Sequence, residues 1–261
     1  MRDSKPTLKL LDVGAGSGTI SATFAKEVPD GRVIATDVKE DILLRARAVA
    51  EEVGVHNIEF QQADVFKLPF ADETFDVTHC HQVLCHLKEP WNALSEMLRV
   101  TKPGGVVAAR EGDLESECVW PELPGLIKFH NLAAGFIKLA GGSPRAGRQL
   151  LSWALKAGAV RERITVSFGT WCYTTPNDKE IWGETSQMTL YTLVMTLWLT
   201  SSNTAQGIVN QIEVGRLRQV GIDTGLTTAN DLDEMAKAWE EWKLSPEATL
   251  GMIHGEILIH K

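Results

Sequence analysis

The sequence has few of the features that mark binding to nucleic acids or membranes. Its formal net charge is −8, and its longest basic cluster is the short run RARA at 45–48. A chain with an acidic balance and no basic patch is a poor match for a phosphate backbone. The longest apolar stretch, at 188–199, is shorter than the roughly 20 residues that a membrane helix needs. We therefore expect neither a nucleic-acid nor a membrane partner.

Cysteine and the signs of secretion are also scarce. The four cysteines lie at scattered positions, which does not suit a disulfide framework in a chain of 261 residues. The first residues, MRDSKPTLKLLDVG, are charged and lead directly into a strand-like run, unlike a signal peptide. We expect a reducing, cytoplasmic location. Internal repeats and low-complexity tracts are absent from the sequence as well.

Regular alternation of short apolar runs and amphipathic segments dominates the first 110 residues. This pattern is typical of βαβ units around a parallel sheet. The predicted strands are 8–14, 31–37, 58–64, 75–81, 106–111, 163–169 and 254–260, and the predicted helices are 18–28, 40–54, 91–101 and 148–159. The chain is expected to form one α/β domain over residues 1–261.

Two segments interrupt this alternation, at about 112–147 and 169–253. Each leaves from the carboxyl end of a predicted strand, the end at which open α/β sheets bind ligands. The second segment has a mostly helical pattern. We expect the two insertions to form a helical lid and a substrate pocket; a surface decoration or a homodimer interface is the alternative.

A glycine-rich loop joins the first predicted strand to the first helix. In LLDVGAGSGT (10–19), glycines occupy positions 14, 16 and 18. Glycine permits a tight turn and close approach of a ligand, and a helix N-terminus offers free N–H groups. Thr19 departs from the G-x-G-x-x-G pattern of dinucleotide folds. Taken alone, the loop is also compatible with an ordinary strand-to-helix turn.

Asp37 strengthens the case for a nucleoside-containing ligand. It ends the second predicted strand, where a carboxylate can accept hydrogen bonds from two ribose hydroxyls. This feature does not separate NAD from S-adenosylmethionine. Asp37 could instead be the N-cap of the helix at 40–54.

An ordered series of motifs carries a family resemblance over residues 8–111. The motifs are LLDVGAGSGT, VIATD, QQADVFKLPFADETFDV, HQVLCHL and EMLRVTKPGGVV. Together they resemble class I S-adenosylmethionine-dependent methyltransferases of the ubiquinone/menaquinone-biosynthesis type. NAD-binding Rossmann proteins share only the first two. A weaker resemblance to small-molecule methyltransferases of fungal secondary metabolism continues into the C-terminal tail.

The resemblance implies a fold, a cofactor and a set of site residues. The fold would be a Rossmann-like, seven-stranded sheet with helices on both faces. The cofactor would be S-adenosylmethionine, with S-adenosylhomocysteine as product and a phenol, enol, quinone-like compound or other secondary metabolite as acceptor. The implied cofactor-binding residues are Asp12, Gly14, Gly16 and Gly18 at the loop, Asp37 and Val38 at ribose and adenine, Asp64 and Val65 at adenine, and His81 beside the methionine part.

The chain departs from the family pattern before the glycine loop. Family members usually carry a helical segment before the glycine loop, whereas seven residues precede LKLLDVG here. Either the two insertions cover the cofactor by themselves, or the chain is truncated. The resemblance also predicts that Lys102–Gly105 forms a structural turn.

The stretch HCHQVLCH at 79–86 looks like a metal-binding cluster. In a strand over 75–81, however, His79 and His81 would share one face while Cys80 points to the other. Zinc requires all its ligands around one point, so no metal is expected. Cys80 and Cys85 are expected in the core, and His86 either in the core or in the pocket.

Candidate catalytic residues follow from the need to deprotonate a phenol or enol. His81, His86 and Glu111 are the candidate bases, with Asp113 beside them. The pocket candidates in the insertions are Trp120, His130, Trp171 and Tyr173, whereas the stripe Met235, Trp239 and Trp242 is expected to face the core. The rival functions are a nicotinamide-dependent oxidoreductase and a cofactor-binding protein with a non-methylating role, such as a pericyclase, cyclase or regulator.

Overall fold

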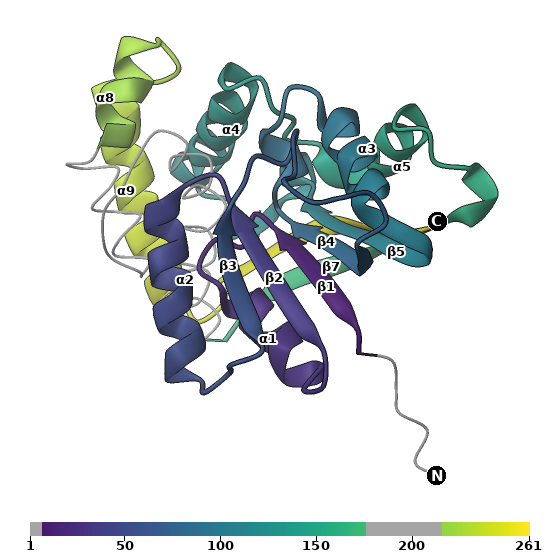
Figure 1. Ribbon diagram of the computed structural model, residues 1–261. Helices are drawn as coiled ribbons and strands as arrows, with labels where there is room; N and C mark the ends of the chain where they lie inside the picture. Colours follow the sequence, from purple (N-terminus) through teal and green to yellow (C-terminus); the bar gives the residue numbers. More distant parts are fainter. Residues whose placement is uncertain (1–6, 176–215) are drawn as a thin grey trace.

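The computed structural model describes residues 7–175 and 216–261 (Figure 1). The strands are β1 Lys9–Val13, β2 Arg32–Asp37, β3 Ile58–Gln62, β4 Phe75–His81, β5 Thr101–Gly112, β6 Cys118–Trp120, β7 Ile164–Tyr173 and β8 Thr249–His260. The helices are α1 Thr19–Glu27, α2 Glu40–Glu52, α3 Pro90–Val100, α4 Pro124–Leu139, α5 Ala146–Lys156, α8 Arg216–Asp223 and α9 Ala229–Leu244, with short 3-10 turns η1 Leu84–His86, η2 Leu114–Ser116 and η3 Arg161–Arg163. The predicted alternation over the first 110 residues is confirmed.

The sheet combines five parallel strands with an antiparallel end. Strands β3, β2, β1, β4 and β5 pair in parallel in that order, and β8 then pairs antiparallel with β5. Strand β7 follows one edge of β8 from Ile259 to Leu250. On the other edge, β5 pairs as far as His254, and the short β6 continues the pairing through Cys118 and Gly251. The described sheet therefore has eight strands, because β6 adds one to the seven predicted.

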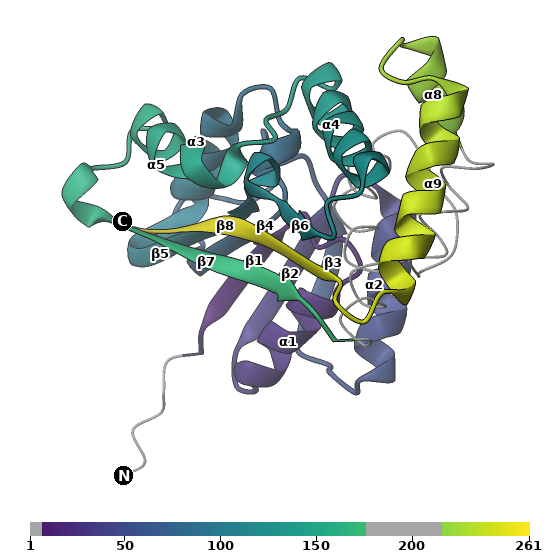
Figure 2. The same ribbon diagram turned by 180° about the vertical axis from the view of Figure 1, so that it is seen from behind.

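Helices cover both faces of the sheet, as predicted (Figures 1 and 2). On one face, α3 and α5 form a core with β4, β5 and β8 that includes Cys80, Leu94, Ala109, Leu150 and Ile257. On the other face, α1 packs Ala25 against Leu10 and Val33 of β1 and β2. Parallel strands need such cover on both sides because their faces are apolar.

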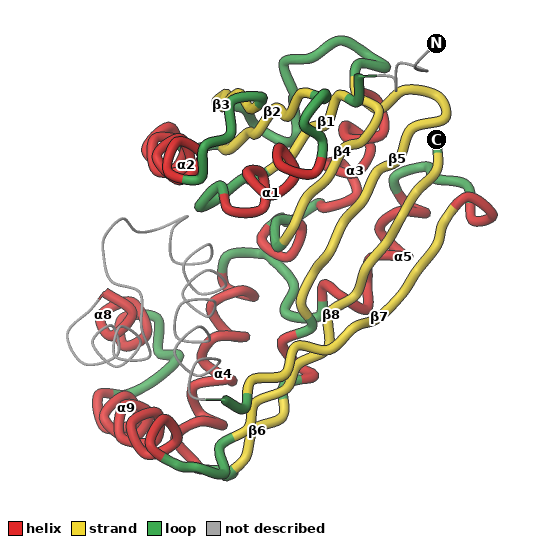
Figure 3. Tube along the Cα trace, turned by 90° about the horizontal axis from the view of Figure 1, so that it is seen from below, coloured by secondary structure: helices red, strands yellow, loops and turns green. Residues whose placement is uncertain are grey.

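The helices of the two insertions share a core of their own. Helix α4 packs on α9, and the buried side chains between them include Phe129, Met235, Trp239 and Trp242. The predicted core stripe on α9 is therefore confirmed. Figure 3 shows α4, α8 and α9 grouped at the β6 end of the sheet, apart from α3 and α5.

The second insertion is shorter than predicted, because β7 and β8 extend into it. These strands pair over ten residues each, from Ile164 and Ile259 to Tyr173 and Leu250. The predicted second insertion therefore loses residues at both ends. Its part at 176–215, including the apolar stretch at 188–199, lies outside the described residues. None of the described helices is long and apolar enough to cross a membrane.

The segment Lys102–Gly105 forms an irregular part of β5, where we predicted a turn before the strand. The register with β4 jumps there, from Phe75–Thr101 to Val77–Val106. The extra residues bond to the end of the chain, since the Gly104 amide donates to the Lys261 carbonyl at 2.8 Å. The role remains structural, but it is performed within a strand.

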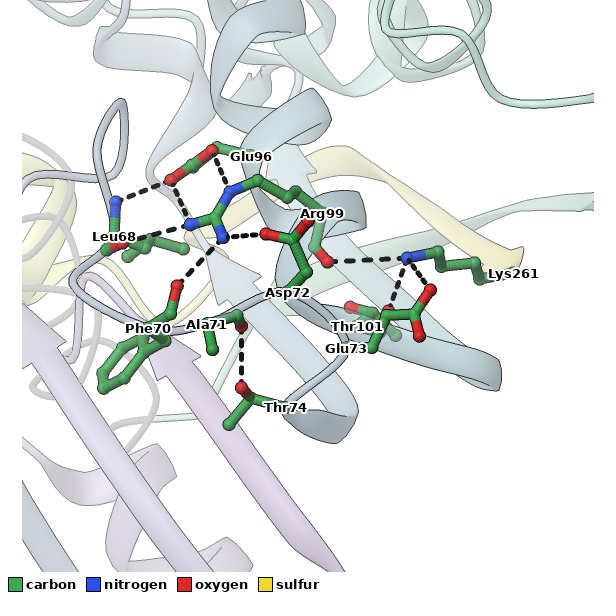
Figure 4. A network of polar contacts seen from close by, with 10 residues as sticks. All are labelled: Leu68, Phe70, Ala71, Asp72, Glu73, Thr74, Glu96, Arg99, Thr101 and Lys261. Carbon is green, nitrogen blue, oxygen red and sulfur yellow. Dashed lines mark hydrogen bonds and ion pairs between the residues drawn. The ribbon is translucent and has the colours of Figure 1, made fainter.

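A polar network holds the amino ends of β4 and β5 (Figure 4). The Arg99 guanidinium donates to the carbonyls of Phe70 at 2.9 Å and Leu68 at 3.1 Å, and it pairs with Glu96 and Asp72. The motif EMLRVTKPGG thus ties the loop before β4 to α3. The polar groups described at this end of the sheet are therefore paired with one another.

Candidate functional site

The glycine loop connects β1 to α1 with its backbone in the left-handed region. Gly14, Gly16 and Gly18 have φ angles of 72°, 54° and 80°. A side chain at such angles is unfavourable, and a Cβ on Gly14 would also lie 2.4 Å from Cγ2 of Val83. The glycines are required by the conformation and, at position 14, by the packing against the turn after β4.

Asp12 fixes the frame around this loop. Its buried carboxylate accepts hydrogen bonds from the Ser21 hydroxyl in α1 and from Nδ1 of His79 in β4, the latter at 2.8 Å. Strand β1, helix α1 and strand β4 are thereby joined at one carboxylate. The resemblance placed Asp12 at the loop, but the sequence gave no sign of Ser21 as its partner.

Asp37 lies at the carboxyl end of β2 beside the glycine loop. Its Oδ2 accepts the Gly16 amide at 3.3 Å, and its Oδ1 accepts the Lys39 amide at 3.1 Å. Burial raises the pKa of this carboxyl above its ordinary value. Lys39 is itself the N-cap of α2, so Asp37 does not take the alternative capping role. The adjacent Val38 is 61% exposed.

Asp64 and Val65 follow β3, next to the end of β2. The Ala63 amide donates to the Asp37 carbonyl at 3.0 Å, so the two strand ends lie side by side. The exposed Asp64 carboxylate accepts the Phe66 amide at 2.9 Å. Asp37, Val38 and Asp64 are therefore brought to the same corner of the sheet, as their predicted roles require.

His81 ends β4 and lies in an aromatic and cationic cluster. Its ring is 6.3 Å from the Trp171 ring, and the Arg110 guanidinium lies 5.0 Å from the same indole. Arg110 also contacts Nε2 of His254 at 2.9 Å. Burial and the charge of Arg110 lower the pKa of His81 to about 4. His81 is thus neutral at pH 7. The sequence had singled out His81 and Trp171 but not Arg110 or His254, which become neighbours only through strand pairing.

Glu111 is fully buried at the carboxyl end of β5. Its carboxylate accepts the amides of Val83 at 2.9 Å, Leu84 at 2.7 Å and Cys85 at 3.3 Å. Burial raises its pKa to about 7. The carboxylate is directed at the backbone of the turn after β4. Its predicted part in proton transfer stays a prediction, and the geometry gives it no support.

His86 is half-buried in the same turn. Within the described part of the chain, neither ring nitrogen has a hydrogen-bond partner. Burial lowers its pKa to about 4. Cys80 and Cys85 are buried in the core as predicted, and β4 runs unbroken through His81. Among residues 7–175 and 216–261, no three His, Cys, Asp or Glu side chains gather as a metal site.

The candidate base Asp113 and the pocket candidates have separate environments. Asp113 is buried and bound to Arg148 of α5, with 2.7 Å between Oδ1 and Nη2. Nδ1 of His130 lies 3.4 Å from a Glu117 carboxylate oxygen. Trp120 is exposed, and Tyr173 is partly buried against the α4–α9 core. Of the predicted pocket residues, Trp171 contacts a residue of the cofactor set, the ring of His81.

The fold and the site together define a class of protein. The reversed strand β8 beside β5, the glycine loop after β1 and the acidic residue ending β2 are the arrangement of a Rossmann-like methyltransferase. A candidate methyltransferase of Bacillus halodurans shares this fold, with a TM-score of 0.54 and 19% identity over 98% of this chain and 94% of that protein.

The sequence places the chain within that class. A family model described as a methyltransferase domain matches residues 4–138, and the chain belongs to this family. An uncharacterized methyltransferase of Schizosaccharomyces pombe is 43% identical over 65% of this chain and 63% of its own length. A ubiquinone/menaquinone biosynthesis C-methyltransferase of Bdellovibrio bacteriovorus is 40% identical over 40% of this chain and 43% of its own length. The chain thus matches less than two thirds of the length of these relatives.

Proposed function

We propose that the protein transfers a methyl group from S-adenosylmethionine to a small organic acceptor. The observation that carries the proposal is the corner formed by the glycine loop and the ends of β2 and β3. There a left-handed glycine backbone lies within hydrogen-bond reach of the Asp37 carboxylate. The family of the chain and its likeness to methyltransferases support the same function.

The residues at this corner suit the nucleoside part of the cofactor. Each Asp37 oxygen takes one backbone amide, which leaves lone pairs for two ribose hydroxyls. The exposed Val38 side chain offers an apolar surface for adenine, and Asp64 can accept from the adenine amino group. Val65 lies beside it. The glycine loop brings backbone N–H groups near the rest of the molecule.

His81 is proposed as a neighbour of the methionine part. When bound, S-adenosylmethionine supplies a methyl group activated by a sulfonium cation. A histidine with a pKa of about 4 adds no second positive charge beside that cation at neutral pH. It is also a weak base there. We therefore assign His81 to positioning, with deprotonation of the acceptor as a lesser role.

The acceptor is proposed to be a small molecule, such as a phenol, an enol or a quinone-like compound. A charge-neutralising transfer gains from alignment and from exclusion of water. Helices α4 and α9, with their own apolar core, are suited to form one wall of such a dry space. The lid role of the insertions, a homodimer and a cytoplasmic location belong to this proposal as predictions.

Calorimetric titration with S-adenosylhomocysteine and with NADH tests the cofactor. The comparison uses Asp37→Ala and Asp30→Ala, because Asp37 ends β2 whereas Asp30 is exposed in the turn before β2. We expect Asp37→Ala to weaken binding of S-adenosylhomocysteine about 10- to 100-fold, the loss of charge-assisted hydrogen bonds. Asp30→Ala should bind like wild type.

Two results would overturn the proposal. Binding of NADH without binding of S-adenosylhomocysteine would favour an oxidoreductase. Tight binding of S-adenosylmethionine without methylated product, across a panel of phenols, enols and quinones followed by mass spectrometry, would favour a non-methylating role.

A further inference from the structure

The turn after β4 lies between the glycine loop and Glu111. It begins at Gln82, whose φ of 57° is unusual for a residue other than glycine, and it continues into η1. The Gln82 amide donates to the Arg110 carbonyl at 3.0 Å, so β5 fixes where the turn starts. What the turn does depends on the contacts on its two sides.

On one side, the turn is held by Glu111. The amides of three consecutive residues, Val83, Leu84 and Cys85, all donate to this one carboxylate. The first amides of a helical turn have no partner within it, and a side chain normally caps them from the residue just before. Here the N-cap residue Val83 supplies no side-chain cap. Glu111, 28 residues further along, supplies the acceptor instead.

On the other side, the turn touches the glycine loop. Val83 fills the space into which a Cβ of Gly14 would point, since that Cβ would lie 2.4 Å from Cγ2 of Val83. Gly14 is the first residue after β1 and begins the loop. A shift of the Val83 backbone would therefore remove the support of the loop at Gly14.

The far end of the turn is equally confined. The Cys85 carbonyl accepts the Ser143 amide at 2.8 Å, and a Cβ on Gly142 would lie 2.1 Å from that carbonyl oxygen. The turn cannot move toward this side. At Val83 and Leu84 the position of the turn is set by the two shortest bonds to Glu111.

We propose that Glu111 is a positioning residue that acts through Val83 on the glycine loop. The importance of this loop for the cofactor rests on the proposed function. The effect of Glu111 on the loop geometry is independent of that function, because it follows from contacts within the chain. Glu111 touches neither the acceptor nor the cofactor in this account.

Glu111→Gln is the informative variant. The glutamine oxygen can still accept from Val83 and Leu84, but its NH₂ group would face the Cys85 amide, donor against donor. The matched control is Glu96→Gln at the opposite end of the sheet. Glu96 also accepts a backbone amide, that of Leu68 at 2.9 Å, and also holds a loop (Figure 4).

Hydrogen exchange of the ligand-free protein is the first measurement. We expect Glu111→Gln to speed exchange of the amides of Gly14–Gly18 by roughly tenfold through local opening. Glu96→Gln should leave these amides unchanged while it lowers the melting temperature. Val83→Ala provides a second route, and we expect it to speed exchange in the same loop. Unchanged exchange at the loop in both Glu111→Gln and Val83→Ala would overturn the proposal.

Titration with S-adenosylhomocysteine is the second measurement. We expect Glu111→Gln and Val83→Ala each to weaken binding about tenfold. The double variant should lose less affinity than the product of the two single losses, because the two residues act in series. Fully multiplicative effects would contradict an action through Val83. If wild type does not bind the ligand while exchange at the loop still responds to Glu111→Gln, the proposed function fails and the positioning role stands.

Discussion

The two ends of the parallel sheet use their carboxylates in different ways. At the amino end, Glu96 pairs with Arg99, and this pairing lowers the pKa of Glu96. At the carboxyl end, Asp37 and Glu111 accept mainly backbone amides, and burial raises the pKa of each. The amino end is closed by side chains of opposite charge. At the carboxyl end, buried carboxylates hold backbone amides at a cost in desolvation, and perturbed groups of this kind cluster at ligand sites.

Two glycines with positive φ angles give the sharpest contrast between these ends. Gly14 has φ 72° and is packed against Val83, whereas Gly104 has φ 80° with nothing within 4 Å of its Cβ position. Gly14→Ala should weaken binding of S-adenosylhomocysteine by more than about 100-fold, because backbone strain and a steric clash add. Gly104→Ala should cost about 1 kcal/mol of stability from strain alone. Calorimetry and thermal unfolding measure both; equal binding by the two variants would contradict a site at the carboxyl end.

Substitution of Arg99 tests whether the amino end of the sheet serves stability alone. Arg99→Ala removes bonds to two loop carbonyls and two carboxylates, so we expect a loss of about 2 kcal/mol in the free energy of unfolding. The affinity for S-adenosylhomocysteine should remain within twofold of wild type, roughly the scatter of independent sites. Arg32→Ala is the control, because Arg32 pairs with Glu59 at an exposed position. Chemical denaturation should show little change for it. A large loss of affinity in Arg99→Ala would contradict the claim that the amino end contributes to stability but not to cofactor binding.

The smallest expected effect concerns acid stability and His86. The pKa of His86 in the folded protein is about 4, below its ordinary value of 6.5. The unfolded state therefore binds the proton more readily, and stability falls as the pH drops from 6.5 through 4. His86→Leu should move the acid unfolding midpoint to lower pH, followed by circular dichroism. His56→Gln, at an exposed position, is the control. An unchanged midpoint in His86→Leu would mean that His86 does not contribute to acid unfolding.

Local patterns were enough to predict most of the fold. Strand β4 was predicted at its observed bounds, and the glycine loop was predicted because glycine spacing and strand ends are local signals. Strand β6 has three residues and is formed by pairing with β8, which no local pattern encodes. The extension of β7 to Tyr173 has the same cause.

The candidate site was predictable where it depends on position in a strand and less so where it depends on partners. Asp37 and Asp64 stand at strand ends, and the structure brings them together as expected. The role of Glu111 required knowledge of the turn it faces, 28 residues earlier in the chain. The cluster of His81, Arg110 and His254 spans three strands, so strand order had to be known first.

The central claim is that the carboxyl end of the sheet binds S-adenosylmethionine. Amide chemical shifts recorded by NMR during titration with S-adenosylhomocysteine test it most directly. We predict that the perturbed amides include Gly14–Gly18, Val38 and Val65, while those of Leu68–Thr74 at the amino end stay in place. Shifts confined to the amino end, or the same response at the carboxyl end to NADH alone, would contradict the account.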